Sequence, residues 1–174
     1  MERIRYVDLG AQWDEERPIL LKKIDKVLSG GVYIGGSEVE GLERDVADLC
    51  GVKFAVALNS GTDALIFALT SLGIRKGDEV ITPPNSFIAT LAAIDHVGAI
   101  PVFVDVKKDQ NIDPVLIESK ITKKTRAILP VHLTGRVADM VAIQEIARNY
   151  NIEIIDQLFK IQTYYLKLNI IIYN

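Results

Sequence analysis

Cysteine is nearly absent from this sequence, and histidine is scarce. Cys50 is the one cysteine, so no disulfide can form within the chain. It lies in an apolar helical pattern, so we expect a small, buried side chain, as is usual for free cysteine. A free thiol fits a reducing compartment, and we predict a cytoplasmic protein without a metal site.

Long apolar runs and an excess of basic charge are also missing. No run is long enough to cross a bilayer, and no signal peptide is evident at the start of the chain, so no membrane partner is expected. The net charge is −3 and there is no basic stripe, so no nucleic-acid partner is expected. Apolar residues make up 49% of the chain and charged residues 25%, which is typical of a soluble globular protein.

The sequence does contain a regular alternation of apolar runs and helical patterns. Apolar runs predict strands over residues 54–58, 79–82, 101–106, 126–131 and 152–155. Helical spacing predicts helices over residues 14–28, 38–50, 63–73, 86–97, 114–120 and 138–150. Pro18 lies near the start of the first helix, and Ser37 and Ser86 are expected N-caps. Uniformly apolar strands separated by helices indicate an α/β fold, with a mainly parallel sheet sandwiched by helices.

Residues 59–65 are the most informative segment. A predicted strand stops there, turns at a glycine and opens a helix. The positive end of a helix dipole, with its free backbone N–H groups, suits a phosphate. Gly61 lets the backbone approach an anion closely, and Ser60 and Thr62 add hydroxyl donors. The same residue types make ordinary helix caps, so that alternative stays open.

Three further side chains are expected at the same sheet edge, where ligands of such folds bind. Phe87 could stack on a planar cofactor, although aromatic rings more often pack in a core. Asp156 could keep a ring nitrogen protonated, or cap a helix. His132 could touch the substrate or cofactor, or make a structural hydrogen bond. With the phosphate cradle, these groups match pyridoxal phosphate better than a dinucleotide, because no G-x-G-x-x-G motif follows the first strand.

Seven motifs in one order extend this interpretation. They are Val-Asp-Leu-Gly-Ala-Gln at 7–12, Tyr-Ile-Gly-Gly-Ser-Glu-Val at 33–39, Asn-Ser-Gly-Thr-Asp-Ala-Leu at 59–65, Gly-Asp-Glu-Val-Ile-Thr-Pro at 77–83, Ser-Phe-Ile-Ala-Thr at 86–90, Pro-Val-Phe-Val-Asp at 101–105 and Pro-Val-His-Leu-Thr-Gly at 130–135. Nearly all of residues 5–155 thereby resembles the DegT/DnrJ/StrS aminotransferases. These are fold-type I pyridoxal-phosphate enzymes that aminate keto-sugars attached to nucleotides, often in amino-sugar and polysaccharide biosynthesis.

The resemblance implies roles for particular residues. Those implied to hold the cofactor phosphate are Ser60, Gly61 and Thr62. Phe87 is implied to stack on the pyridine ring, while Tyr33 and Ile34 belong to a segment that shapes the sugar-nucleotide site, often across a homodimer interface. The resemblance also implies glutamate as the amino donor. The pattern at residues 8–12 favours amination at C3 of the sugar over C4.

Two departures from the family pattern limit these expectations. Members continue the last strand with Glu-Asp-Ala-Ala-Gln, and their Asp pairs with the pyridine nitrogen. Here Asp156 takes the Glu position and Gln157 the Asp position, unless the register slips by one and makes Asp156 the partner. The family's Schiff-base lysine lies in a Ser-Phe-x-x-x-Lys context that this sequence does not contain.

We therefore predict an inactive, truncated large domain, with no catalytic residue assigned. Residues 1–35 form an N-terminal segment, 36–156 an incomplete pyridoxal-phosphate-binding domain, and 157–174 either one more strand or a non-native tail. Three alternatives stay open. They are a sugar dehydratase of the same family that uses pyridoxamine phosphate, a non-catalytic remnant that binds phosphate, and a small Rossmann-like nucleotide binder.

Overall fold

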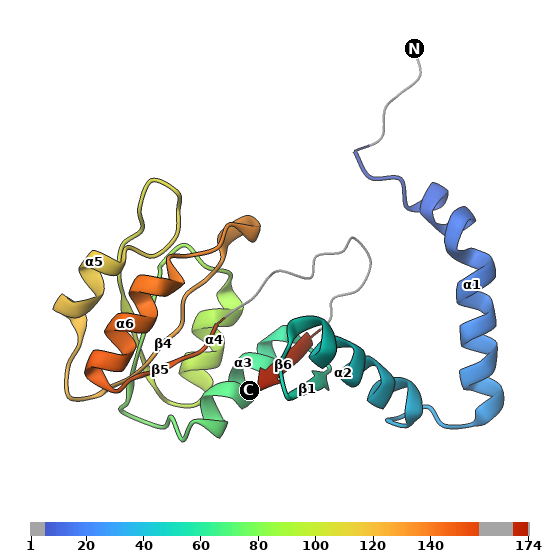
Figure 1. The fold of residues 1–174 in the computed structure, drawn as a ribbon, viewed down its shortest axis with the longest axis horizontal. Helices are drawn as coiled ribbons and strands as arrows, with labels where there is room; N and C mark the ends of the chain where they lie inside the picture. The colour runs from blue at the N-terminus through green and yellow to red at the C-terminus, as the bar shows by residue number, and fades with distance from the viewer. Residues whose placement is uncertain (1–5, 157–168, 174) are drawn as a thin grey trace, which may run out of the picture.

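The computed structural model describes residues 6–156 and 169–173 (Figure 1). It confirms every strand and helix predicted before residue 156, and all but β1 and β2 have shifted boundaries. The helices are α1 (Leu9–Gly30), α2 (Ser37–Cys50), α3 (Gly61–Ser71), α4 (Ile88–His96), α5 (Pro114–Ile117) and α6 (Met140–Tyr150), with short 3-10 turns at Glu118–Lys120 and Leu133–Gly135. The strands are β1 (Phe54–Leu58), β2 (Glu79–Thr82), β3 (Ile100–Phe103), β4 (Thr125–Ile128), β5 (Glu153–Ile154) and β6 (Asn169–Tyr173).

The main sheet has four strands in the order β3-β2-β4-β5, and all neighbouring pairs are parallel. Val80 and Ile81 are adjacent in β2 and wholly buried, but they belong to two different apolar clusters. Successive side chains of a strand point to opposite faces, so both faces of the sheet are covered. The fold is therefore α/β, as the sequence predicts.

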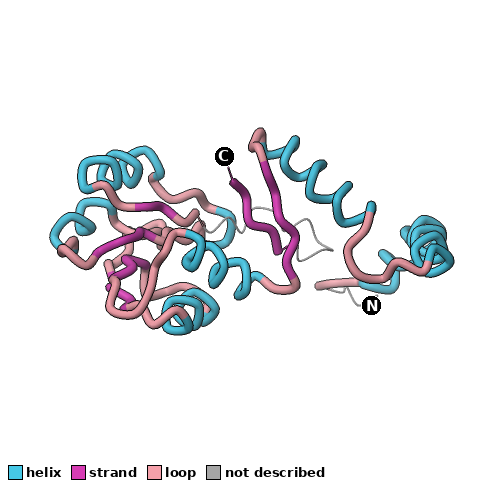
Figure 2. The backbone as a smooth tube through the Cα atoms, turned by 90° about the horizontal axis from the view of Figure 1, so that it is seen from below, coloured by secondary structure: helices cyan, strands magenta, loops and turns pink. Residues whose placement is uncertain are grey.

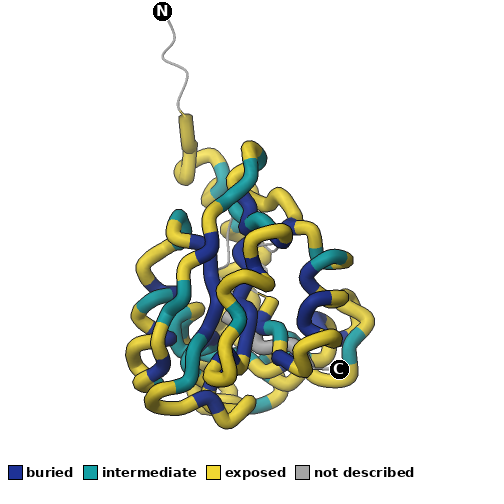
Figure 3. The backbone as a smooth tube through the Cα atoms, turned by 90° about the vertical axis from the view of Figure 1, so that its left-hand side faces the viewer, coloured by how far each residue is buried: buried dark blue, intermediate teal, exposed yellow. Residues whose placement is uncertain are grey.

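Each face of this sheet is covered by two helices. The first cluster joins β2 and β4 to α3 and α4 through Leu65, Leu69, Ala93 and Ile94. The second joins the opposite face to α5 and α6 through Ile117, Ile143, Ile146 and Ala147. Figure 3 shows the buried stretches running through the middle of this body, with exposed backbone around them.

β1 differs from the prediction, because it does not join the parallel sheet. It pairs antiparallel with β6, from Phe54 opposite Tyr173 to Leu58 opposite Asn169, and this pair stands apart from the other strands (Figure 2). The Ala57 N–H donates to the Glu43 carboxylate of α2 at 2.8 Å, so a side chain occupies a donor that a neighbouring strand would otherwise use. One of the two expectations for residues 157–174 was a further strand, and β6 is such a strand. Residues 157–168 lie outside the described part of the chain.

Helix α1 stands away from the sheet (Figures 1 and 2). It contains no buried residue, and most of its apolar residues are exposed. The helix begins earlier than predicted because Asp8 caps it by accepting from the Ala11 N–H at 3.1 Å, which places Pro18 inside the helix. Lys26 forms an exposed ion pair with Glu38 of α2, and this hydrogen bond, followed by the charge of Lys26, lowers the pKa of the Glu38 carboxyl.

Three local predictions were wrong. Gly36, not Ser37, is the N-cap of α2, with φ of 83°, and it makes no side-chain cap bond. Phe87, not Ser86, is the N-cap of α4, because the Ser86 hydroxyl instead bonds to the Thr90 hydroxyl at 2.6 Å. Cys50 is exposed rather than buried; it is the last residue of α2, and the buried side chains of that helix are Val46 and Ala47. Among the helices of the described residues, none is long and apolar enough to cross a membrane.

Candidate functional site

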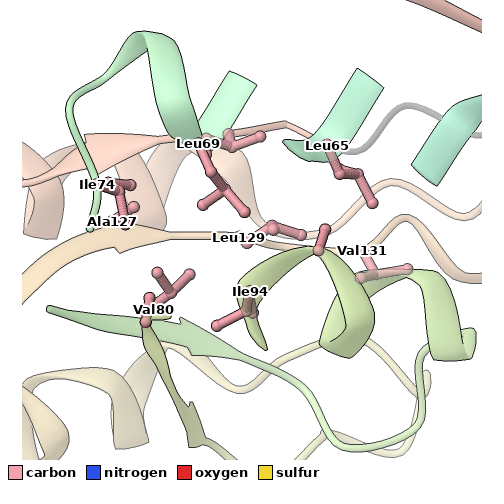
Figure 4. Close-up of a cluster of buried hydrophobic side chains, with 11 residues drawn as sticks. Leu65, Leu69, Ile74, Val80, Ile94, Ala127, Leu129 and Val131 are labelled. Atoms are coloured by element: carbon pink, nitrogen blue, oxygen red, sulfur yellow. The ribbon is translucent and has the colours of Figure 1, made fainter. Parts of the chain in front are cut away.

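The first turn of α3 lies at the carboxyl end of β4. In Figure 4, Leu65 near the start of α3 and Val131, which follows β4, lie at the same end of the apolar cluster. At the opposite end of the same cluster, Ile74 after α3 lies beside Ala127 within β4. α3 therefore runs antiparallel to β4, and its positive end reaches the edge where ligands of parallel sheets bind.

Ser60 is the N-cap of α3. Its hydroxyl oxygen accepts from the Asp63 N–H at 3.0 Å, and its carbonyl accepts from the Ala64 N–H at 3.0 Å. The N–H groups of Gly61 and Thr62 precede the first intrahelical bonds, so helix geometry gives them no acceptor within α3. Ser60 is therefore a helix cap, and the same turn still presents two backbone donors to an anion.

Phe87 lies at the start of α4, directly after the loop that follows β2. The residue is 66% exposed, so it does not pack in the core. The loop before it is held from the side, because the Asn85 amide donates to the Gln110 carbonyl at 2.9 Å. An exposed ring on an anchored loop at this edge is free to contact a planar ligand.

His132 and Asp156 follow β4 and β5 and form a close pair. The Nε2 atom of His132 lies 2.6 Å from a carboxylate oxygen of Asp156, and the His132 residue is 1% exposed. The Nδ1 atom accepts from the Ala138 N–H at 2.9 Å. Because Nδ1 is an acceptor, the ring proton is on Nε2, and His132 is a neutral donor to the carboxylate.

This pair fixes where the Asp156 carboxylate lies. Asp156 has 37% of its side chain exposed, so it keeps a face toward solvent while His132 holds one oxygen. The structure thus places a carboxylate at the carboxyl edge of the sheet, whereas Gln157 lies outside the described residues. Both ring nitrogens of His132 are engaged, and its expected contact with substrate stays a prediction.

The structure does not bring Tyr33 and Ile34 to this edge. They lie in the linker between α1 and α2, at the end of α2 far from β1 (Figure 1). The two residues are 68% and 93% exposed, and the Tyr33 hydroxyl donates to the Leu28 carbonyl at 3.2 Å. Their predicted contribution to a sugar-nucleotide site therefore stays a prediction.

Sequence reasoning missed Asn111, which is wholly buried beside the His132 loop. Its side chain accepts from the Leu133 N–H at 3.3 Å and donates to the carbonyls of Arg136 and Val137 at 3.2 and 3.3 Å. No spacing pattern marks such a residue, since its partners lie more than twenty positions away. Within residues 6–156, no group of three His, Cys, Asp or Glu side chains is placed to hold a metal.

Comparison with known proteins shows which family this chain belongs to. Residues 14–157 match the DegT/DnrJ/EryC1/StrS aminotransferase family. The chain is 44% identical over 155 residues to a dTDP-3-amino-3,4,6-trideoxy-alpha-D-glucose transaminase of Streptomyces venezuelae, covering 88% of the chain and 41% of that protein. It is 42% identical to a UDP-2-acetamido-2-deoxy-3-oxo-D-glucuronate aminotransferase of Pseudomonas aeruginosa, covering 88% of the chain and 43% of that protein.

Solved structures agree with the sequence relatives. DesV of Streptomyces venezuelae superposes with a TM-score of 0.86 at 43% identity, over 90% of this chain and 42% of that one. NtdA of Bacillus subtilis, with bound pyridoxamine phosphate, superposes with a TM-score of 0.83 at 36% identity, over 89% of this chain and 37% of that one. The chain thus spans about two fifths of the length of these relatives.

Proposed function

Since this chain belongs to the DegT/DnrJ/EryC1/StrS aminotransferase family, we propose that it is part of an aminotransferase that acts on a nucleotide-linked keto-sugar. The similarity to named sugar transaminases carries the proposal. The cofactor of this family is pyridoxal phosphate, or its amino form. The same names favour transamination over the dehydratase alternative.

The first turn of α3 fits the phosphate of this cofactor. Gly61 and Thr62 offer backbone N–H groups at a helix N-terminus, and the Ser60 hydroxyl can still donate its own hydrogen after it accepts from Asp63. Gly61 has helical backbone geometry, so nothing in its φ requires glycine. The absence of a side chain there instead allows an anion to approach the N–H groups.

The opposite end of the cofactor fits Phe87 and Asp156. An exposed ring can cover one face of a pyridine, and a carboxylate held by His132 can keep a proton on the ring nitrogen, because opposite charges favour both ionised forms. When bound, a protonated pyridine ring withdraws electrons and stabilises negative charge on the carbon atom that reacts. The protein contributes by positioning that ring and by maintaining its proton.

The remaining functional assignments are part of the same proposal. The substrate is a keto-sugar linked to a nucleotide, with amination at C3 and glutamate as the amino donor, and the protein functions as a cytoplasmic homodimer. Tyr33 and Ile34 contribute to a sugar-nucleotide site across the dimer interface. Residues 36–156 bind the cofactor, with 1–35 as a separate N-terminal segment. The printed sequence contains no Ser-Phe-x-x-x-Lys, so we expect no turnover from this chain alone.

The cofactor assignment can be tested by measuring the binding of pyridoxamine phosphate to the chain by equilibrium dialysis. This form carries no aldehyde, so surface lysines cannot trap it. We expect at least about tenfold tighter binding of pyridoxamine phosphate than of pyridoxamine or inorganic phosphate, because the site contacts both ends of the ligand. Equal affinity for inorganic phosphate would instead support a phosphate-binding remnant. Binding of NAD without pyridoxamine phosphate would support the Rossmann-like alternative.

A glycine exchange separates phosphate binding from stability. Gly61→Ala is expected to weaken pyridoxamine phosphate binding about tenfold or more, because a methyl group intrudes where the anion approaches. The same exchange should leave the free energy of unfolding unchanged or raise it by up to about 1 kcal/mol, since alanine is the better helix former. Dialysis and urea unfolding measure the two effects.

Gly41→Ala is the matched control. Gly41 lies within α2, and a Cβ atom there meets no other atom within 4 Å. This variant should gain about 0.5–1 kcal/mol of stability and keep the wild-type affinity. Unchanged affinity in Gly61→Ala would remove the phosphate from the first turn of α3.

A further inference from the structure

Asn111 lies in a tight turn between β3 and α5. The turn is closed by the isolated bridge between Val106 and Ile112 and by the bond from the Lys107 N–H to the Asn111 carbonyl at 2.9 Å. Gln110 within the turn has φ of 70°, a conformation that few side chains favour. The turn therefore has a defined shape that points the Asn111 side chain inward, where it is wholly buried.

The loop after β4 depends on this side chain for its backbone hydrogen bonds. Residues 132–138 contain no strand and only one short 3-10 turn, so many of their polar groups have no regular partner. Asn111 uses both ends of its amide there. Its oxygen accepts from the Leu133 N–H, and its nitrogen donates to the Arg136 and Val137 carbonyls. One amide therefore holds both the beginning and the end of this loop.

The end of the loop carries the donor that sets the state of His132. Ala138 directly follows Val137, and its N–H donates to His132 Nδ1 at 2.9 Å. If the Val137 carbonyl moved away from Asn111, the Ala138 N–H would move with it, because both belong to the same peptide unit. His132 Nδ1 would then lose the partner that keeps the ring proton on Nε2, next to Asp156.

We propose that Asn111 is a positioning residue that holds the Ala138 N–H against His132 Nδ1 and thereby keeps the His132 proton directed at the Asp156 carboxylate. The three links run from Asn111 to the Val137–Ala138 peptide, from that peptide to His132, and from His132 to Asp156. The part played by the carboxylate rests on the proposed function, whereas the hydrogen-bond chain itself does not.

The test observes the central hydrogen bond directly, without any cofactor. In the ¹⁵N-labelled chain, an NMR scalar coupling between the Ala138 amide nitrogen and His132 Nδ1 reports the hydrogen bond between them. We expect this coupling in the wild type and its loss in Asn111→Asp, which keeps the acceptor for Leu133 but removes both donors to the carbonyls. The Ala138 amide should also exchange with solvent about tenfold faster or more. In Asn111→Ser the side chain is too short to reach both carbonyls, so we expect the same loss of coupling and the same faster exchange.

Thr82→Val is the matched control. The Thr82 hydroxyl is also wholly buried and donates to the Leu129 carbonyl at 2.9 Å, but it makes no bond to residues 132–138. This variant should lose stability and keep the coupling. Retention of the coupling in both Asn111 variants would overturn the proposal, as would its absence from the wild type. If both Asn111 variants fail to fold while Thr82→Val folds, Asn111 contributes to the stability of the whole fold, and the proposal is also overturned.

These outcomes are independent of the cofactor assignment. If pyridoxamine phosphate does not bind the wild type but the coupling follows the expected pattern, the proposed function fails and the role of Asn111 stands. If the cofactor binds and the coupling survives both exchanges, the role of Asn111 fails and the proposed function stands.

Discussion

Replacing Asp156 by alanine is expected to weaken pyridoxamine phosphate binding by about tenfold or more and to destabilise the fold by about 1–3 kcal/mol. The affinity falls because the ring nitrogen loses the negative charge that favours its protonated form. The stability falls because the Nε2–H of His132, in a residue that is 1% exposed, loses its acceptor at 2.6 Å. Equilibrium dialysis and urea unfolding measure the two effects.

Asp156→Asn separates charge from hydrogen bonding. Its amide oxygen can still accept from His132, so the variant should recover most of the stability lost in Asp156→Ala. It carries no negative charge, so the weaker binding should persist. Wild-type affinity in both variants would show that binding does not depend on the Asp156 carboxylate and would remove Asp156 from the proposed cofactor site.

The second large effect concerns the apolar layer between α3 and the sheet. Leu69→Ala is expected to lower the free energy of unfolding by about 2–5 kcal/mol, because the side chain is wholly buried and its removal leaves a cavity. This is a large share of the stability of an ordinary domain, which is about 5–15 kcal/mol. Urea unfolding followed by circular dichroism gives the change in midpoint.

Leu49→Ala is the control for the loss of stability expected in Leu69→Ala. Leu49 lies in α2 and is 77% exposed, so the same chemical change should alter the stability by about 0.5 kcal/mol or less. A loss in Leu69→Ala no greater than that in Leu49→Ala would mean that α3 does not pack on the sheet as Figure 4 shows.

The elements of the sheet could be predicted because local pattern and tertiary structure agree there. β2 occupies the predicted residues 79–82, since an apolar run buried on both faces has a strong signature in sequence. Helix starts were harder. At α4, the Ser86 hydroxyl bonds to Thr90 rather than to a backbone N–H, and this choice between two nearby partners leaves no mark in the sequence.

The pairing of site residues could not be predicted from pattern. His132 and Asp156 were each expected at the sheet edge from their positions after strands, but their contact joins two loops whose paths depend on the whole fold. Asn111 was missed because its three partners are backbone groups of a distant irregular loop. The prediction that β1 belongs to the parallel sheet was also wrong, because nothing in the local sequence distinguishes a strand of that sheet from one that pairs elsewhere.

The bond between Glu43 and β1 has a consequence for association between copies of the chain. A strand with unpaired backbone donors is a template onto which another chain can add. At Ala57 the outward N–H is already taken by the Glu43 carboxylate, and the opposite side of β1 is paired with β6. An incoming strand would have to displace a charged acceptor that is covalently tethered through α2. Glu43 therefore opposes edge-to-edge aggregation at this strand.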